Sequence, residues 1–333
     1  MGVDVNFWGI YLVGWGEMCI FAGDNCFLLK LNCGTMKQSI FVAGMILLAA
    51  SCSNERVELA ENAVVERAVA PVTVSVSGFS ISQEGFAGTR GTAVGDYDGV
   101  KVLTLAFYQA DDGSQVFKQT QIKGNMAAGE TFGEFSTRLG VGSYTMVVIA
   151  NGGSNAVALT SPTEATYGEN RVLDTFANTQ TVTVSSSAAV SVSATLERVV
   201  TALVVQSTDI RPAEVTHMRL TYSGGGKGFN PTTGLALSDA GFVNLMDYRG
   251  DAGATTISGG YLFLATDEET MDVTIETLDA ADGNVVFSKT VTDVPLKRNR
   301  QTTLTGAIYS NARVNASGFE VSDSWISSQS ISF

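Results

Sequence analysis

The sequence predicts an all-β protein with two β-sandwich domains in tandem. Glycine is abundant and proline scarce, with 35 Gly and 5 Pro among 333 residues. Apolar and polar residues alternate in short segments that Gly, Asn and Asp separate, and helical spacing of apolar residues is nearly absent. This pattern is typical of antiparallel strands that bury one face and expose the other. Many such strands in one chain favour sandwiches.

Eight segments show the alternation most clearly, and we expect each to be a strand. They are residues 72–77, 101–108, 143–150, 179–184, 199–206, 261–266, 271–278 and 302–309. A Ser-rich strand from 182 to 193 is expected to end the first domain, and the apolar run 199–205 to begin the second. The predicted domains are therefore residues 71–195 and 196–333.

Two segments resemble each other at an offset of 170 residues. Residues 105–122 and 275–292 each hold an Asp-Gly pair, at Gly113 and Gly283, between alternating runs. Asp-Gly is a strong hairpin signal, because glycine accepts the positive φ that the turn requires. The two segments are either copies of one hairpin or two hairpins that look alike because both use Asp-Gly.

The chain carries the pattern of an export signal ahead of the predicted domains. A basic start at Met36 is followed by the apolar run 40–50 and then by Cys52, and no cysteine follows Cys52. This layout resembles a bacterial lipoprotein signal, although Ala49 stands where leucine is usual. We expect a signal peptide over 36–51, lipidation of Cys52 and a tether over 52–70. The alternative is an ordinary secreted protein with a free thiol at Cys52.

Residues 1–35 fit no folded role in this scheme. They hold three cysteines, and the spacing of seven residues between them suits no zinc site. We expect translation to start at Met36, with 1–35 an incorrectly assigned start. An additional targeting segment is the alternative.

The net charge of −13 argues against nucleic acid as a partner, since binding it requires clustered Lys and Arg. No basic amphipathic helix is visible, so contact with the membrane is expected only through acyl chains on Cys52.

No pattern predicts an enzyme, a cofactor or a metal. The one histidine, His217, lies in a strand-like segment without a motif that supplies catalytic partners. Residues 96–99 resemble the start of a calcium loop but lack the distal bidentate carboxylate. Residues 224–227, Gly-Gly-Gly-Lys, lack the spacing of a phosphate loop.

Aromatic residues are spread along the strands, and we expect them in the core or in cross-strand pairs. The residues concerned are Phe107, Tyr108, Phe117, Phe135 and Tyr144. Loops could still assemble a few aromatics into a sugar-binding platform, so a surface glycan-binding lipoprotein is the alternative function.

A series of segments in the mature chain resembles the fimbrillins, the type V pilin subunits and anchors of Bacteroidales. The resemblance rests on their order and spacing after a lipoprotein signal. The segments are residues 89–91, 100–108, 142–151, 196–200 and 294–300.

The resemblance implies two transthyretin-like domains and a structural role in surface fimbriae, with other fimbrial subunits as partners. Family members are exported to the outer membrane as lipoproteins. An arginine-specific protease cuts the polymerising members, and a strand from another subunit replaces the released first strand.

Two arginines are candidate cleavage sites, and the C-terminal tail is a candidate donor strand. Cutting at Arg90 would release the lipid with one strand, whereas cutting at Arg67 would release the lipid alone. Five apolar residues of the tail fall on one period-2 face, namely Phe319, Val321, Trp325, Ile331 and Phe333. The tail could equally be the last strand of its own domain.

Overall fold

The computed structural model describes residues 9–14, 17–22, 25–30, 68–80, 94–169, 171–248, 250, 252–310 and 320–323. All regular structure in these residues is β-strand, which confirms the all-β prediction. None of these segments is a helix that could cross a membrane. The strands fall into two units, Met1–Val65 and Glu66–Phe333.

The first unit contains an antiparallel three-stranded sheet in the order β1-β2-β3. Its strands are β1 (Gly9–Gly14), β2 (Glu17–Ala22) and β3 (Asn25–Lys30). The sequence predicted no folded role here, and the strands correct that expectation. Short runs rich in Ile, Phe, Leu and Val favour strands even without a clean alternation. Met36 as the start of translation stays a prediction.

In the second unit, seven of the described strands between residues 68 and 198 form one sheet in the order β6-β5-β8-β11-β12-β4-β7. The strands are β4 (Val69–Ser80), β5 (Val102–Gln109), β6 (Gln115–Ile122), β7 (Glu134–Gly140), β8 (Gly142–Asn151), β11 (Thr175–Val184) and β12 (Val190–Arg198).

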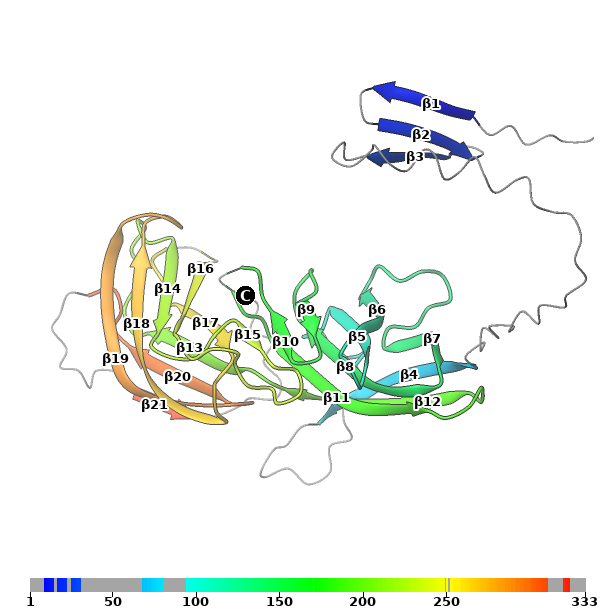
Figure 1. Ribbon diagram of the computed structural model, residues 1–333. Helices are drawn as coiled ribbons and strands as arrows, with labels where there is room; N and C mark the ends of the chain where they lie inside the picture. Colours follow the sequence, from blue (N-terminus) through cyan, green and yellow to red (C-terminus); the bar gives the residue numbers. More distant parts are fainter. Residues whose placement is uncertain are drawn as a thin grey trace, which may run out of the picture. The chain divides into compact units, whose positions relative to one another are not determined.

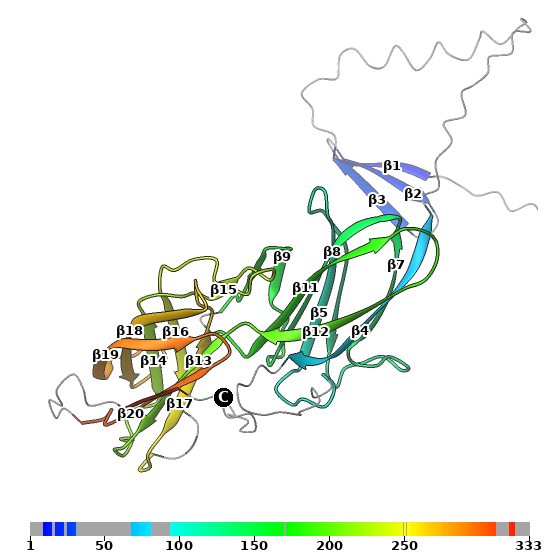
Figure 2. The same cartoon turned by 90° about the horizontal axis from the view of Figure 1, so that it is seen from below.

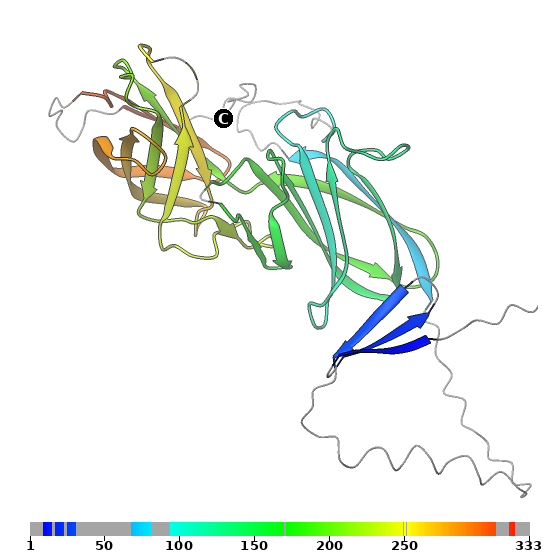
Figure 3. The same cartoon turned by 90° about the horizontal axis from the view of Figure 1, so that it is seen from above.

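This sheet folds over on itself into two layers. β6-β5-β8-β11 forms one layer and β12-β4-β7 the other, as Figures 1 and 2 show. Seen from above in Figure 3, β4 in light blue is separated from the β5–β6 hairpin in teal. Apolar side chains from both layers, among them Val74, Leu105, Phe135 and Met146, form the core between them.

β5 and β8 are buried on both faces, which differs from the expected single wet face. The outer face of this layer, with Tyr108 and Ile149, is covered by a small sheet in the order β15-β10-β9. Its strands are β9 (Ala158–Ser161), β10 (Glu164–Thr166) and β15 (Gly228–Phe229). The near-continuous apolar sequence of β5 and β8 is the signal of burial on both sides.

Eight of the described strands between residues 201 and 323 form two facing four-stranded sheets, β16-β14-β18-β19 and β17-β13-β20-β21. The strands are β13 (Thr201–Ser207), β14 (His217–Tyr222), β16 (Phe242–Asp247), β17 (Ile257–Leu262), β18 (Glu268–Leu278), β19 (Val285–Lys297), β20 (Gln301–Gly306) and β21 (Glu320–Asp323). The expected strand at 261–266 is therefore shifted, because it ends at Leu262.

The pairings of the first half recur in the second half. β4 is parallel to the last strand β12 and antiparallel to β7, just as β13 is parallel to β20 and antiparallel to β17. β5 pairs with β6 and β8, just as β14 pairs with β16 and β18. β8 pairs with β11 as β18 does with β19. The two halves thus share one order of strands.

Both Asp-Gly segments form the hairpins that the sequence predicted, β5–β6 and β18–β19. Each has a Thr–Thr hydrogen bond across its strands, Thr104–Thr120 at 3.1 Å and Thr274–Thr290 at 3.0 Å. In the shared strand order, however, β5–β6 corresponds to β14–β16 and β18–β19 to β8–β11. The hairpins occupy different places in the two halves, so their likeness reflects their common turn.

Candidate assembly interface

The first strand of the folded unit, β4, lies inside its sheet and pairs on both sides. It pairs with β7 along Val69–Ser75 and with β12 along Val72–Ser80. Its side chains alternate, with Val72, Val74 and Val76 buried and Thr73 exposed. The strand therefore fills a slot between β7 and β12 and supplies part of the apolar core.

The end of β4 packs against an aromatic group beside the junction of the two halves. Phe79 of β4 lies 4.6 Å from Phe176 and 5.1 Å from Tyr97, measured between ring centroids. The Arg198 guanidinium stacks over the Phe176 ring at 4.6 Å, within the range of a cation–π contact. The three rings thus connect β4 with the residue that ends β12.

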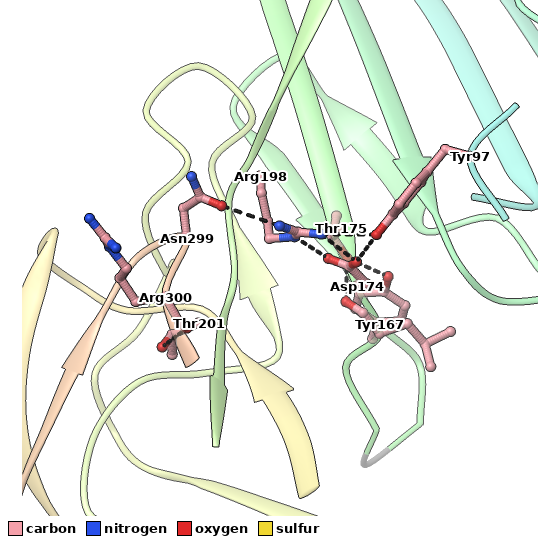
Figure 4. Close-up of polar contacts among 9 residues, drawn as sticks. Tyr97, Tyr167, Asp174, Thr175, Arg198, Thr201, Asn299 and Arg300 are labelled. Carbon is pink, nitrogen blue, oxygen red and sulfur yellow. Dashed lines mark hydrogen bonds and ion pairs between the residues drawn. The ribbon is translucent and has the colours of Figure 1, made fainter. Parts of the chain in front are cut away.

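Arg198 makes a buried ion pair at this point (Figure 4). Its Nε donates to Asp174 Oδ1 at 2.7 Å and its Nη2 donates to Asp174 Oδ2 at 3.0 Å. The same Nη2 also donates to the Tyr97 hydroxyl at 3.0 Å, and Nη1 donates to Asn299 Oδ1 at 3.3 Å. Both charged side chains are about nine-tenths buried. We call these four residues the junction clasp.

The clasp joins the two halves, because Asn299 lies in the turn between β19 and β20. Burial, followed by the charge of Asp174, raises the pKa of Tyr97, so its hydroxyl stays protonated and available as a donor and acceptor. Burial likewise raises the pKa of the neighbouring Tyr261. An ion pair with every polar partner engaged fits a structural connection, with no group left free for acid–base chemistry.

A buried amide connects the two layers on the opposite side of the first half. Gln121 of β6, 4% exposed, donates from Nε2 to the Glu134 carbonyl at 2.7 Å and accepts from the Gly133 N–H at 2.8 Å. In the second half Asn244 of β16 occupies the corresponding place, facing Gly260 of β17. It is fully buried, and neither end of its amide finds a hydrogen-bond partner among the described residues.

Most of the predicted site residues lie outside the described part of the chain. These are Cys52, Arg67, Arg90, Phe319, Trp325, Ile331 and Phe333. Val321 lies in β21, opposite Leu304 of the same chain's β20. Arg90 belongs to residues 81–93, which connect β4 with Val94.

The residues considered for chemistry have structural partners. His217 is the first residue of β14, and its ring nitrogen Nδ1 lies 2.7 Å from the hydroxyl of the preceding Thr216. Asp98 faces Lys123, and Asp112 accepts the Ser114 N–H, as turn residues do. In the described part of the chain, no group of His, Cys, Asp and Glu could hold a metal ion.

The aromatic residues follow the prediction for core positions. Phe107, Tyr108, Phe135 and Tyr144 are at most 3% exposed, and Phe107 faces Phe117 across the β5–β6 pair. The large apolar side chains exposed on the described surface are all aliphatic. The described strands therefore offer no platform of aromatic rings for a sugar.

A family model covers most of the folded chain. The model of a family of unknown function, DUF6562, matches residues 66–319. The chain belongs to this family. A comparison with curated protein sequences finds no match.

Several solved structures resemble this DUF6562 protein. The fimbrial anchor protein Mfa2 of Porphyromonas gingivalis has a TM-score of 0.42 and 12% identity, over 71% of this chain and 90% of that one. The tip fimbrial protein Mfa3 of the same organism has 0.36 and 12%, over 77% and 98%. A Bacteroides ovatus protein described as a candidate cell adhesion protein has 0.43 and 15%, over 79% and 100%.

The resemblance to fimbrillins is thus confirmed at the level of structural neighbours, which include fimbrial proteins of Bacteroidales. At these TM-scores and sequence identities, the structural similarity gives no evidence about function. Function is inferred below from the strand arrangement of the DUF6562 protein itself.

Proposed function

We propose that this protein is a non-enzymatic structural subunit or anchor of cell-surface fimbriae, which assembles by strand addition between subunits. The observation that carries the proposal is the place of β4, the first strand of the folded unit and yet an inner strand of its sheet. Lipidated Cys52 would attach the chain to the outer membrane, and the partners would be other fimbrial subunits.

The shared strand order supports two tandem transthyretin-like domains. Seven strands of each half correspond in order, with β4 parallel to β12 and β13 parallel to β20, and β12 leads into β13 through only Val199 and Val200. The boundary expected between 195 and 196 falls within β12, close to this connection. The described elements thus agree with one sandwich repeated.

Release of β4 would create an acceptor for a strand. β7 and β12 would each lose a backbone partner, and the core would lose Ala70, Val72, Val74 and Val76. Unpaired N–H and C=O groups beside vacated apolar pockets are the requirements for binding an added strand. A strand with alternating apolar residues would restore both the hydrogen bonds and the core.

Cleavage at Arg90 would free β4, and cleavage at Arg67 would not. Arg67 precedes Val69, the first residue of β4, so a cut there leaves the strand connected to the rest of the fold. A cut at Arg90 leaves β4 held only by non-covalent contacts. The tail with Phe319, Val321, Trp325, Ile331 and Phe333 is the proposed donor, and its alternation matches that of β4.

The proposal is tested by treating the purified full chain and the variants Arg90→Ala and Arg67→Ala with an arginine-specific protease. We expect a fragment starting at Gly91, loss of the β4 segment and sedimenting oligomers from the wild type and from Arg67→Ala. Arg90→Ala should keep β4 covalently attached and should gain no assembly over the untreated chain. A gain in oligomers when Arg90→Ala is treated with the protease, or no gain in assembly by the wild type after complete cleavage, would overturn the proposal.

A further inference from the structure

The edge of β12 that faces away from β4 is open along most of its length. β11 and β12 pair only at Phe176–Arg198 and Ala177–Glu197, although a five-residue turn connects them. Beyond these pairs the strands diverge toward the turn, as Figure 2 shows. The residues from Val190 to Leu196 therefore have a backbone partner, β4, on one side only. We call this stretch the β12 edge.

Two side-chain amides cover part of the β12 edge. Asn178 Nδ2 donates to the Thr195 carbonyl at 2.9 Å, and Gln180 Nε2 donates to the Ser193 carbonyl at 3.0 Å. Both bonds are exposed to solvent. They show that these carbonyls point away from β4 and accept donors. An incoming strand could replace these amides with its own N–H groups.

The corresponding edge in the second half is covered by another strand. β20 matches β12 in the shared order, since each is the last strand and lies parallel to the first. On its other side β20 pairs with β21, from Thr302–Asp323 to Thr305–Glu320. In the first half β11 pairs with β12 only at Phe176–Arg198 and Ala177–Glu197, and no described strand pairs with Val190–Leu196 on this side. One of two equivalent edges is thus filled and the other open.

The sequence of the β12 edge lacks the features that block pairing. Edge strands are commonly protected by charges, proline or bulges. The long edge strand β19 has Lys289, Pro295 and a bulge at Asp293, where φ is 58°. The β12 edge, Val-Ser-Val-Ser-Ala-Thr-Leu, has no charge and no proline and is rich in residues that favour strands. Its one register shift with β4, at Ala194–Thr195, places the extra residue, Ser77, on β4.

We propose that the β12 edge is a second strand-acceptor site and that its occupant is the tail strand β21 of a second copy. β21 is the choice because it already pairs with the equivalent strand β20. Only four of its residues pair there, so exchange between copies breaks few backbone pairs. Head-to-tail exchange would link copies in series.

This inference deepens the proposed assembly function by adding an acceptor that requires no cleavage. The two are separable, because β4 remains in place while the β12 edge is used. The intact chain should therefore self-associate, whereas assembly through the slot of β4 begins only after proteolysis.

The test uses complementary variants of the intact full chain, with sedimentation velocity as the measurement. Ser193→Pro removes the N–H of residue 193 from the β12 edge. The N–H and C=O of one strand residue point to the same side, and the Ser193 carbonyl points away from β4. The hydrogen bonds between β12 and β4 are therefore kept. This variant can donate but not accept. A chain ending at Ser310 lacks β21 and can accept but not donate. Circular dichroism of each variant verifies folding.

A pair of charge variants provides a control that does not depend on proline. Ser191→Lys places a charge on the β12 edge, and Thr73→Lys places the same charge on the same exposed face of the inner strand β4, since the two residues are register partners. Ser191→Lys should weaken self-association at least tenfold, and Thr73→Lys should leave it unchanged.

We expect the wild type to form oligomers, each of the two complementary variants alone to be monomeric, and their mixture to stop at a one-to-one dimer. Oligomers from Ser193→Pro, or self-association of Ser191→Lys as strong as that of Thr73→Lys, would overturn the assignment of the β12 edge. A monomeric intact wild type that assembles only after cleavage would overturn this inference and leave the proposed function standing. A chain that never assembles would overturn both.

Discussion

The buried amides of Gln121 and Asn244 occupy equivalent places in the two halves, but only that of Gln121 is hydrogen-bonded. The two residues should therefore respond differently to apolar substitution. Gln121 satisfies the buried Gly133 N–H and the Glu134 carbonyl, whereas the Asn244 amide has no partner among the described residues. Replacing each by the apolar side chain closest in shape isolates the polar contribution. The variants are Gln121→Met and Asn244→Leu.

Gln121→Met should lower the free energy of unfolding by about 3–5 kcal/mol. Two hydrogen bonds are lost, each with a net contribution of roughly 1 kcal/mol, and an unsatisfied buried N–H adds about 1–3 kcal/mol. Asn244→Leu should leave stability unchanged or raise it, since it removes two unpaired polar atoms from a buried site. Leucine has the same branched shape as asparagine, and apolar Leu173 and Met246 lie beside the site.

The assay is urea unfolding of the full chain, followed by circular dichroism and tyrosine fluorescence, with the transition midpoints compared. The reasoning would be refuted by equal losses of stability in the two variants. It would also be refuted by a loss greater than about 1 kcal/mol in Asn244→Leu, because a side chain without hydrogen bonds has none to lose.

Two further predictions concern alkaline pH and the junction clasp. Burial raises the pKa of Tyr108 to about 12. The unfolded chain therefore loses this proton near pH 10 while the folded chain keeps it, and stability should fall between pH 10 and 12. Tyr108→Phe should reduce that fall in urea titrations at pH 8 and 11, and an equal fall would contradict it. Arg198→Ala leaves the buried Asp174 carboxylate without its cationic partner. It should lower the free energy of unfolding by about 3 kcal/mol, measured by thermal or urea unfolding. The double variant with Asp174→Ala should cost less than the sum of the single variants, and strict additivity would exclude the clasp as a coupled pair.

Local patterns in the sequence were sufficient for the fold class and for most strands. The alternation in residues 72–77 marks β4, and Asp-Gly marks both hairpins, because these signals depend on near neighbours alone. The burial of β5 on both faces depends on β9 and β10, more than fifty residues away along the chain. The sequence of β5, Val-Leu-Thr-Leu-Ala-Phe-Tyr, carried a signal of this in its continuous apolar run.

The junction clasp and the Gln121 bridge could not be predicted from the sequence. Asp174 and Arg198 are ordinary charged residues at strand ends, and their pairing depends on where the two layers meet. Residues 105–122 and 275–292 are similar in sequence, but they are not equivalent in the shared strand order. Their offset of 170 residues is therefore not the offset that relates the two halves. The shared order is visible only in strand pairings, which link β4 with β12 across more than a hundred residues.

In the proposed assembly, β4 is released so that a strand of another subunit can replace it. The most direct test is the intact mass and N-terminal sequence of the protein recovered from cell surfaces, together with its state of assembly. Our account predicts chains that begin at Gly91 and migrate as a ladder of oligomers. Monomeric chains that all begin at lipidated Cys52, with β4 still covalently attached, would contradict it.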